Sequence, residues 1–423
     1  MVLAFACNFV LLGSYYILRP VRDAMATVFG VDQLQDLFTG TLVLTLVCAP
    51  LFAWITDTFK LSRVLPGVFW FLVLNLLVFH LLFNAFPENR WLAAAFYWWL
   101  SVVNLFMISI FWSLIVDVFT ANQGARLFPA IAAGGTLGAI AGPLLARLFA
   151  KTLGVSGLLL LAAAGLVIVI VLVHWLMREK HRLQESREEA QASTLDHRLT
   201  GNILDGFRAI FTSGYLVNQA LFILLMTWVA TVGYFLQTEF IANSFANLAD
   251  RTRALADIDL AVNICSAVVL LFGLNRFIMR FGVTASLILN PIFMAISFVL
   301  MALSPTLMML QAMQGLRRVT QYAIARPSRE ICFTVVAQEQ RYKAKNVIDT
   351  VVYRLGDLSA AWVQAGLRMA GFGFEGMLAL GVLASGLWGI NSWVLGRQYE
   401  NRRAAHLESP EGGPADVAKQ APR

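Results

Sequence analysis

Apolar stretches long enough to cross a lipid bilayer recur along almost the whole chain. A membrane-spanning helix needs roughly 20 predominantly apolar residues, and segmentation by hydropathy predicts twelve such helices. They begin near Val2, Leu37, Leu65, Trp91, Leu127, Val155, Tyr215, Leu255, Val283, Thr306, Ile348 and Phe374. The alternating strands of outer-membrane barrels, about ten residues long, are not the pattern seen here. The chain is therefore predicted to be an all-α polytopic membrane protein.

Two polar stretches divide this pattern into predicted domains. Residues 178–206 are rich in charged and polar side chains and are predicted to form a cytosolic linker. Residues 397–423 have no apolar face and are predicted to be a disordered cytosolic tail. Residues 1–177 and 207–396 then form two halves of six helices each.

A short motif supports the division into two halves. Thr120 followed by Arg126 returns as Thr334 followed by Arg341, at the inner end of the fourth helix of each half. Repeats of this kind are typical of transporters whose halves pack around a central site.

Composition excludes a water-soluble enzyme. Only 13% of the 423 residues are charged and 59% are hydrophobic, whereas about a quarter of a soluble domain is charged. The mean hydropathy is +0.70. Because no cleavable signal peptide is recognisable, we expect a multi-pass protein of the bacterial inner (cytoplasmic) membrane.

The net charge of +7 reflects topology rather than a nucleic-acid partner. Most lysines and arginines lie in segments that are cytosolic when the N-terminus is inside, as the positive-inside rule requires. Both termini are therefore predicted to be cytosolic. The sequence has no histidine or cysteine cluster and no phosphate-binding loop in a strand–helix context, so we expect no metal, no cofactor and no nucleic acid.

The loop between the second and third predicted helices holds Asp57, Lys60 and Arg63. This arrangement resembles the cytosolic signature of the major facilitator superfamily, in which an acidic residue and bases hold neighbouring helices in one conformational state. We predict a gating or coupling role for all three residues. The alternative is that the two bases serve only the positive-inside topology.

Gly134, Gly138 and Gly142 lie four residues apart on the fifth predicted helix. They form one face of small residues, which lets a neighbouring helix approach closely. With Pro143 after them, they also resemble the glycine-proline motif of facilitator antiporters. Both interpretations stay open on the sequence, with packing as the commoner one.

Ionisable side chains inside predicted spans indicate functional sites because each one is costly at bilayer depth. On the first helix, Tyr15, Arg19 and Arg22 share one face. Asp23 lies four residues after Arg19 and is predicted to pair with it. The alternative places these charges at the outer end of the helix, beyond the lipid.

The tenth predicted helix indicates a functional site more strongly. It enters from outside, so Arg317 and Arg318 lie about 17 Å deep at about 1.5 Å per residue. Pro327 is expected to kink this helix or to free a carbonyl group. Arg326 is predicted to pair with Glu330, four residues later.

Arginine outnumbers carboxylates on the helices that carry these residues. Arginine stays protonated and offers a planar fork suited to phosphate or carboxylate, so the substrate is predicted to be a small anion. The predicted substrate-binding residues are Tyr15, Arg19, Arg22, Asp23, Arg317, Arg318, Tyr322, Arg326, Arg329, Glu330 and Arg354. Three further carboxylates are predicted to take part in gating or coupling, namely Asp117, Asp349 and Asp357.

Motifs in both halves resemble those of one transporter family, and the block from Phe111 to Gly135 also resembles it in spacing. They are Tyr16 to Asp23, Phe111-Trp112, Arg126 to Pro129 with Gly134-Gly135, Tyr322 to Glu330, Lys343 to Lys345, Ile348-Asp349 and Arg354 to Gly356. Together they resemble the ATP/ADP translocases of plastids and intracellular bacteria. The resemblance implies a facilitator-like nucleotide exchanger in which Arg22 and Arg329 contact phosphates and Glu330 helps set the site.

Two positions depart from the family pattern. A lysine would be expected where this chain has Asp357, which inverts a charge. Asp117 stands where an uncharged polar residue would be unsurprising. The family fold is therefore better supported than its ATP/ADP specificity.

The sequence thus predicts a secondary active transporter of an anionic, phosphorylated metabolite, with nucleotide exchange by alternating access as the first choice. We expect it to function in the lipid bilayer as a monomer. One alternative is a proton-coupled facilitator for another organic anion. A membrane enzyme is less favoured because no nucleophile-base pair is evident, and a scaffold would not need arginines at bilayer depth.

The topology can be tested with reporter fusions placed after Met177 and after Arg397. Both are expected to report a cytosolic location because the basic residues concentrate on that side. An external signal from either fusion contradicts the arrangement of two halves with six helices each.

Overall fold

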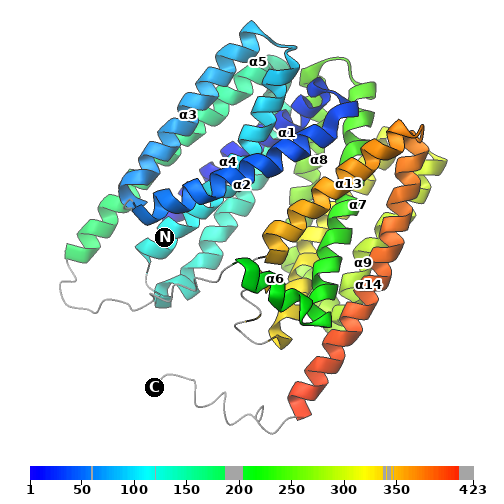
Figure 1. The fold of residues 1–423 in the computed structure, drawn as a ribbon. Helices are drawn as coiled ribbons and strands as arrows, with labels where there is room; N and C mark the ends of the chain where they lie inside the picture. The colour runs from blue at the N-terminus through cyan, green and yellow to red at the C-terminus, as the bar shows by residue number, and fades with distance from the viewer. Residues whose placement is uncertain are drawn as a thin grey trace. The chain divides into compact units, whose positions relative to one another are not determined.

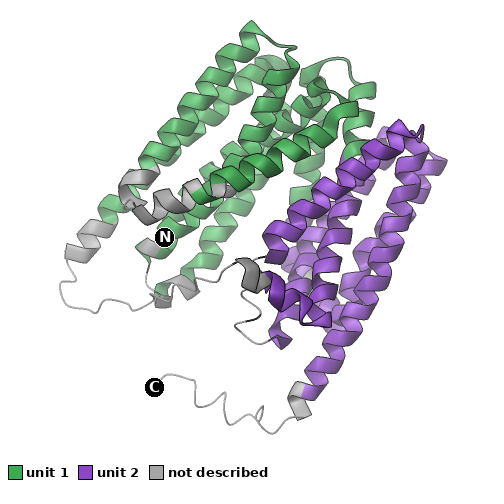
Figure 2. Cartoon of the chain, viewed as in Figure 1, with its two compact units in different colours: residues 1–197, 235–264 green, residues 198–234, 265–423 purple. Residues whose placement is uncertain are grey.

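The computed structural model describes residues 1–58, 61–119, 121–185, 203–336, 340, 344–345 and 347–408. Within these residues the chain is helical and contains no strand. The chain divides into two compact units (Figure 2): residues 1–197 with 235–264 form unit 1, and residues 198–234 with 265–423 form unit 2. The two sequence halves, 1–177 and 207–396, stay a prediction.

Unit 1 is built on five helices that follow one another along the chain (Figure 1). They are α1 (Val2–Phe29), α2 (Leu34–Thr58), α3 (Leu61–Ala85), α4 (Arg90–Val118) and α5 (Ala121–Glu185). Asn89 caps α4, since its side chain accepts hydrogen bonds from the Trp91 and Leu92 amides. Gly154 adopts a φ of 66° and breaks α5 into two helical segments. The break agrees with the predicted start of a sixth helix near Val155.

The glycine face of α5 packs directly against α1. A Cβ atom at Gly138 would lie 2.2 Å from the Phe9 carbonyl oxygen, and one at Gly142 would lie 2.5 Å from that of Gly13. Gly134 is equally close to α1, at 2.5 Å from the Phe5 carbonyl oxygen. This contact accounts for the glycine spacing through packing alone.

Unit 2 contains the helices from α6 onward, apart from the residues assigned to unit 1. They are α6 (Ile203–Phe211), α9 (Leu274–Leu303), α10 (Leu307–Thr320), α11 (Arg326–Cys332), α13 (Tyr353–Met369) and α14 (Phe374–Glu408). Three π-helical turns, η2 (Val269–Gly273), η3 (Gln321–Ala325) and η5 (Ile348–Val352), interrupt the α-helices. The turn η3 directly precedes Arg326-Pro327, so the regular α-helix is interrupted next to this proline. The kink or free carbonyl expected at Pro327 stays a prediction.

One helical hairpin belongs to both units. Helix α7 (Gly214–Ser244) starts in unit 2 and ends in unit 1, and α8 (Leu248–Val268) starts in unit 1 and ends in unit 2. Residues 235–264 therefore pack within unit 1, although the chain on both sides of them packs within unit 2. We call residues 235–264 the α7–α8 tip.

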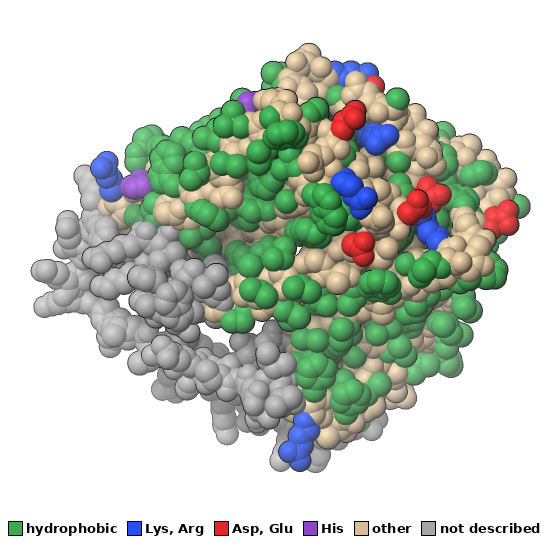
Figure 3. All heavy atoms as spheres, turned by 45° about the horizontal axis from the view of Figure 1, so that its top comes forward, with side chains coloured by type: hydrophobic (Ala, Val, Ile, Leu, Met, Phe, Trp, Pro, Cys, Tyr) green, Lys and Arg blue, Asp and Glu red, His purple; other side chains and the backbone are tan. Residues whose placement is uncertain are grey.

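Eight of the described helical segments are long and apolar enough to cross a membrane. The segments predicted to begin near Leu37, Thr306 and Ile348 are not among them, and those predicted near Leu127 and Val155 form one continuous segment, Arg126–Glu179. Large apolar side chains such as Met279 and Leu271 are 81% and 75% exposed, and hydrophobic side chains cover much of the surface in Figure 3. This is a membrane protein, and its twelve spans stay a prediction.

Helices extend into both segments that were predicted to be the linker and the tail. Helix α5 continues to Glu185, and α14 continues to Glu408, twelve residues into the predicted tail from Arg397. The extension of α14 is held by packing, since it runs alongside α9 in Figure 1 and Thr284 donates a 2.6 Å hydrogen bond to Glu400. Arg402 also stacks over the Tyr215 ring at 4.5 Å. Residues 203–206 of the predicted linker begin α6, and residues 186–202 and 409–423 lie outside the described residues.

The close α1–α5 contact predicts that alanine is less well tolerated at Gly138 than at a glycine with open space around it. Gly138→Ala is expected to lower the melting temperature in detergent, because the new methyl group meets backbone atoms that cannot move away cheaply. Gly386→Ala, in an exposed part of α14 with open space around it, is expected to leave it unchanged or raise it, since alanine favours the helix. Equal melting temperatures for the two variants would contradict the close packing.

Candidate functional site

Two consecutive arginines near the end of α10 are buried. Arg317 is 8% exposed and Arg318 is 4% exposed. Arg317 donates from Nε to Gln314 Oε1 at 2.9 Å and from Nη1 to Gln321 Oε1 at 3.0 Å. The Gln314 amide donates in turn to the Gly233 carbonyl oxygen on α7 at 2.8 Å. These neutral amides orient the Arg317 guanidinium without cancelling its charge.

The predicted coupling residue Asp357 lies where α13 contacts α7. Thr231 on α7 donates to Asp357 Oδ1 at 3.2 Å, and Arg354 Nη1 lies 3.9 Å from Asp357 Oδ2. The helices approach closely because residue 356 is glycine, where a Cβ atom would lie 2.0 Å from Thr227 Oγ1. Asp357 is thus positioned by groups from both helices.

Tyr353 joins the α10 and α13 groups into one region of unit 2. Its phenol lies within electrostatic range of Asp357, Arg354, Arg317 and Tyr322. Four residues predicted from the sequence to bind substrate or take part in coupling therefore gather around a single side chain.

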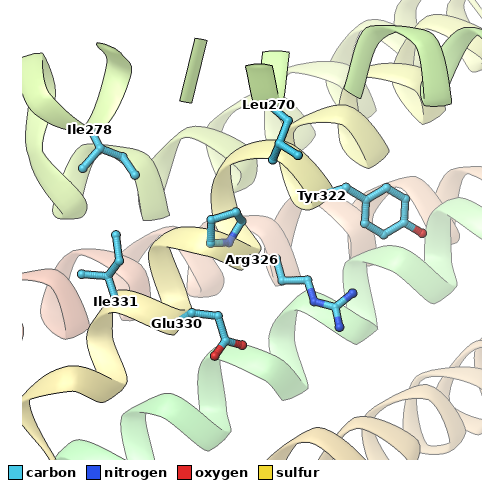
Figure 4. Close-up of a pocket in the computed structure, with 7 residues that line it drawn as sticks. Leu270, Ile278, Tyr322, Arg326, Glu330 and Ile331 are labelled. Atoms are coloured by element: carbon cyan, nitrogen blue, oxygen red, sulfur yellow. The ribbon is translucent and has the colours of Figure 1, made fainter. Parts of the chain in front are cut away.

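A cavity of about 600 Å³ opens beside α11 and η3 in unit 2. It is lined by Leu270, Ile278, Tyr322, Arg326, Pro327, Glu330 and Ile331. Figure 4 shows the charged ends of Arg326 and Glu330 pointing away from the apolar side chains of Leu270 and Ile278. The cavity therefore has an apolar side and a charged side.

Arg329 is the centre of an ion network next to this cavity. It is 5% exposed, and it donates to Asp349 Oδ1 at 2.6 Å and to Glu330 Oε1 at 3.0 Å. Lys345 pairs with the second oxygen of Glu330. The predicted pairing of Arg326 with Glu330 is wrong, because the Glu330 carboxylate turns instead toward the buried Arg329, whose charge needs compensation.

In unit 1 the charged residues of α1 lie against α8 and against one another. Arg22 donates twice to Asp23 Oδ1, at 3.0 and 2.7 Å. The predicted partner of Asp23, Arg19, lies with its Nε 3.6 Å from Oδ2 of a different carboxylate, Asp259 on α8. Tyr15 is buried within electrostatic range of all four of these charges.

The sequence analysis did not select Asp259 as a site residue, although an ionisable side chain inside a predicted span was the criterion used for the other residues. Asp259 is an ionisable residue inside the eighth predicted span, and it is 2% exposed. Lys345 lies in a family motif but its pairing with Glu330 depends on the fold. In both cases the partner lies on a segment whose position the sequence spacing does not give.

Four of the six predicted gating residues have side chains outside the described part of the structure. Lys60 lies outside the described residues, and so do the side chains of Asp57, Arg63 and Asp117. The other two, Asp349 and Asp357, lie in the Arg329 network and at the α7–α13 contact. In the part of the chain that the structure describes, no group of histidine, cysteine or acidic residues is arranged to hold a metal ion.

Comparisons with known proteins identify transporters as the proteins that this chain resembles. A family model described as "Major Facilitator Superfamily" matches residues 4–316. The "ADP,ATP carrier protein 1" of Chlamydia pneumoniae is 22% identical over 324 residues. That alignment covers 66% of this chain and 61% of the carrier, so less than two thirds of the carrier's length is matched. The match confirms the resemblance inferred from the sequence motifs.

Solved structures of transporters share the fold. The nucleoside transporter NupG has a TM-score of 0.60 at 14% identity, covering 93% of this chain and 96% of that chain. A bacterial homologue of the iron transporter ferroportin, in an inward-facing state, has a TM-score of 0.65 at 13% identity, covering 93% and 97%. At these identities the likeness concerns the fold alone. Every protein named here is a transporter, which agrees with the prediction that the chain is not an enzyme.

Proposed function

The chain belongs to the Major Facilitator Superfamily and is a membrane transporter, and on that premise we propose that it exchanges an anionic, phosphorylated metabolite by alternating access. A nucleotide is the first candidate because the sequence motifs and one relative, an ADP,ATP carrier, both favour it. We also propose that the protein works as a monomer in the bacterial inner membrane with both termini in the cytosol.

The excess of positive charge in unit 2 carries this proposal. Between Arg317 and Asp357, the described residues include six cationic side chains and three carboxylates. The cations are Arg317, Arg318, Arg326, Arg329, Lys345 and Arg354, and the carboxylates are Glu330, Asp349 and Asp357. Arginine keeps its charge when buried, and a buried charge is stable only when it is compensated. A substrate with several negative charges supplies that compensation.

The arrangement of neighbouring groups favours a phosphate ester with an organic part. Arg326 and Glu330 give the cavity of unit 2 a charged side, and Leu270 and Ile278 give it an apolar side. The Tyr322 ring lies at the same cavity and can stack on a planar group. An inorganic anion would leave this apolar side unused.

The excess of positive charge also favours exchange over net transport. If the empty carrier closed both gates, the excess positive charge would be enclosed without water, which is costly. A bound anion removes that cost, so the loaded carrier reorients faster than the empty one. We therefore propose obligatory exchange.

Proton-coupled transport of another organic anion is the second candidate. Asp357 favours it, because a carboxylate held by Thr231 and Arg354 stands where the translocase pattern would place a lysine. A carboxylate that binds and releases a proton during the cycle could couple the two fluxes.

Neutralising two arginines tests the substrate class. Arg22→Gln and Arg329→Gln are expected to weaken binding of radiolabelled ADP by about tenfold or more, since a hydrogen bond to a charged group contributes about 1.5 to 3 kcal/mol. The matched control is Arg397→Gln, because the Arg397 side chain is 64% exposed on α14. Equilibrium binding to purified protein is the measurement.

Expression and folding of all three variants are checked by size-exclusion chromatography. If Arg22→Gln and Arg329→Gln both bind ADP like the parent, these arginines do not contact the substrate. If the control loses as much affinity as they do, the effect is one of overall charge.

A further inference from the structure

Three ion pairs join the α7–α8 tip to α1 and α5 within unit 1. On α8, Asp259 pairs with Arg19 of α1 at 3.6 Å. Asp257 and Asp250 pair with Arg147 and Lys151 of α5, at 2.9 and 2.7 Å. Ion pairs thus hold the tip to two helices of the N-terminal part of the chain. The segments before and after the tip belong to unit 2.

Burial separates one of these pairs from the other two. The side chains of Arg147 and Asp257 are 44% and 37% exposed, so water screens their attraction. The Arg19 and Asp259 side chains are 14% and 3% exposed. Removing one member of such a buried pair leaves an uncompensated charge and is far more costly than breaking a surface pair.

Two further hydrogen bonds, one of them from the positively charged Arg251, complete the contact. Arg251 donates to Thr27 Oγ1 on α1 at 2.9 Å, and the Asn263 amide donates to the Ala139 carbonyl oxygen on α5. Neither hydrogen bond contains a negative charge that could compete with an anionic ligand for Arg19. Asp259 is different, because it offers a negative charge to an arginine that the sequence places in the substrate site.

We propose that Asp259 is an internal counter-anion, which neutralises Arg19 while the site is empty and which the anionic substrate displaces. This inference rests on the proposed function, since it assumes a phosphorylated substrate at Arg19. At 3.6 Å the Arg19–Asp259 contact is an ion pair longer than a hydrogen bond. A phosphate that accepts short, charge-assisted hydrogen bonds from the guanidinium binds it more strongly.

Displacement links substrate binding to the position of the α7–α8 tip. A phosphate that holds Arg19 competes with Asp259 for the same guanidinium, so the attraction between α1 and the tip weakens and docking of the tip becomes less favourable. By linkage, a docked tip must weaken substrate binding by the same factor. Asp259 therefore acts as a positioning residue that couples the occupied site to the release of the tip.

The test compares Asp259→Asn with Asp257→Asn, which removes the same charge from the same helix at an exposed pair. Equilibrium binding of radiolabelled ADP to purified protein is one readout. The other is the yield of a thiol cross-link between cysteines that replace Lys151 and Asp250, measured without ligand. Asp259→Glu keeps the charge and shows whether the site tolerates substitution.

Asp259→Asn is expected to bind ADP about tenfold more tightly, since ADP no longer competes with a carboxylate, and to lower the cross-linking yield. Asp257→Asn and Asp259→Glu are expected to stay close to the parent in both readouts. Unchanged or weaker ADP binding by Asp259→Asn, with parent-like binding by the two controls, overturns the inference.

Failure of the proposed function gives a different result. If the parent binds neither ADP nor inorganic pyrophosphate, the phosphorylated substrate is wrong, and the cross-link alone decides the role of Asp259. A lower yield in Asp259→Asn then supports its role in holding the tip through Arg19. An unchanged yield overturns the inference as well.

Discussion

The burial of arginine in a membrane protein is the constraint on which this structure depends. A guanidinium keeps its charge at any depth, so the fold must supply an acceptor for each buried one. Unit 1 does so with carboxylates, since Asp23 accepts from Arg22 and Asp259 faces Arg19. In unit 2, Arg329 donates to carboxylates, whereas Arg317 donates to the neutral side-chain oxygens of glutamines. Cationic side chains still outnumber carboxylates among the described residues between Arg317 and Asp357, and this excess favours a substrate that is itself an anion.

Close helix packing makes these pairs possible. The glycine face of α5 brings α1 within backbone contact, which fixes the rotation of α1 and so the direction of its arginines. In unit 2, Gly356 brings α13 against α7 and places Asp357 next to Thr231. Small residues at a helix contact thus help to determine where the large charged residues of the two packed helices point.

Hydropathy was sufficient to predict an all-α membrane fold, because each apolar segment is a local property of the chain, and short residue motifs were sufficient to predict the family. The break in α5 at Gly154 and the π turn before Pro327 also have local causes. Partners across helices were not predictable in this way. Glu330 had two arginines within helical reach, and the choice of Arg329 depends on burial and on Lys345 from another segment. Asp259 is paired with a residue 240 positions earlier, which no spacing rule reaches.

In the proposed exchange mechanism, a bound anion compensates the positive charge that prevents the empty carrier from reorienting. The most direct measurement compares uptake of labelled ADP into vesicles preloaded with unlabelled ADP and into vesicles that contain only buffer, each with and without a pH gradient. The account predicts uptake into the preloaded vesicles alone and no dependence on the gradient. Uptake into buffer-filled vesicles that disappears when the gradient is collapsed would contradict it and would favour proton coupling through Asp357.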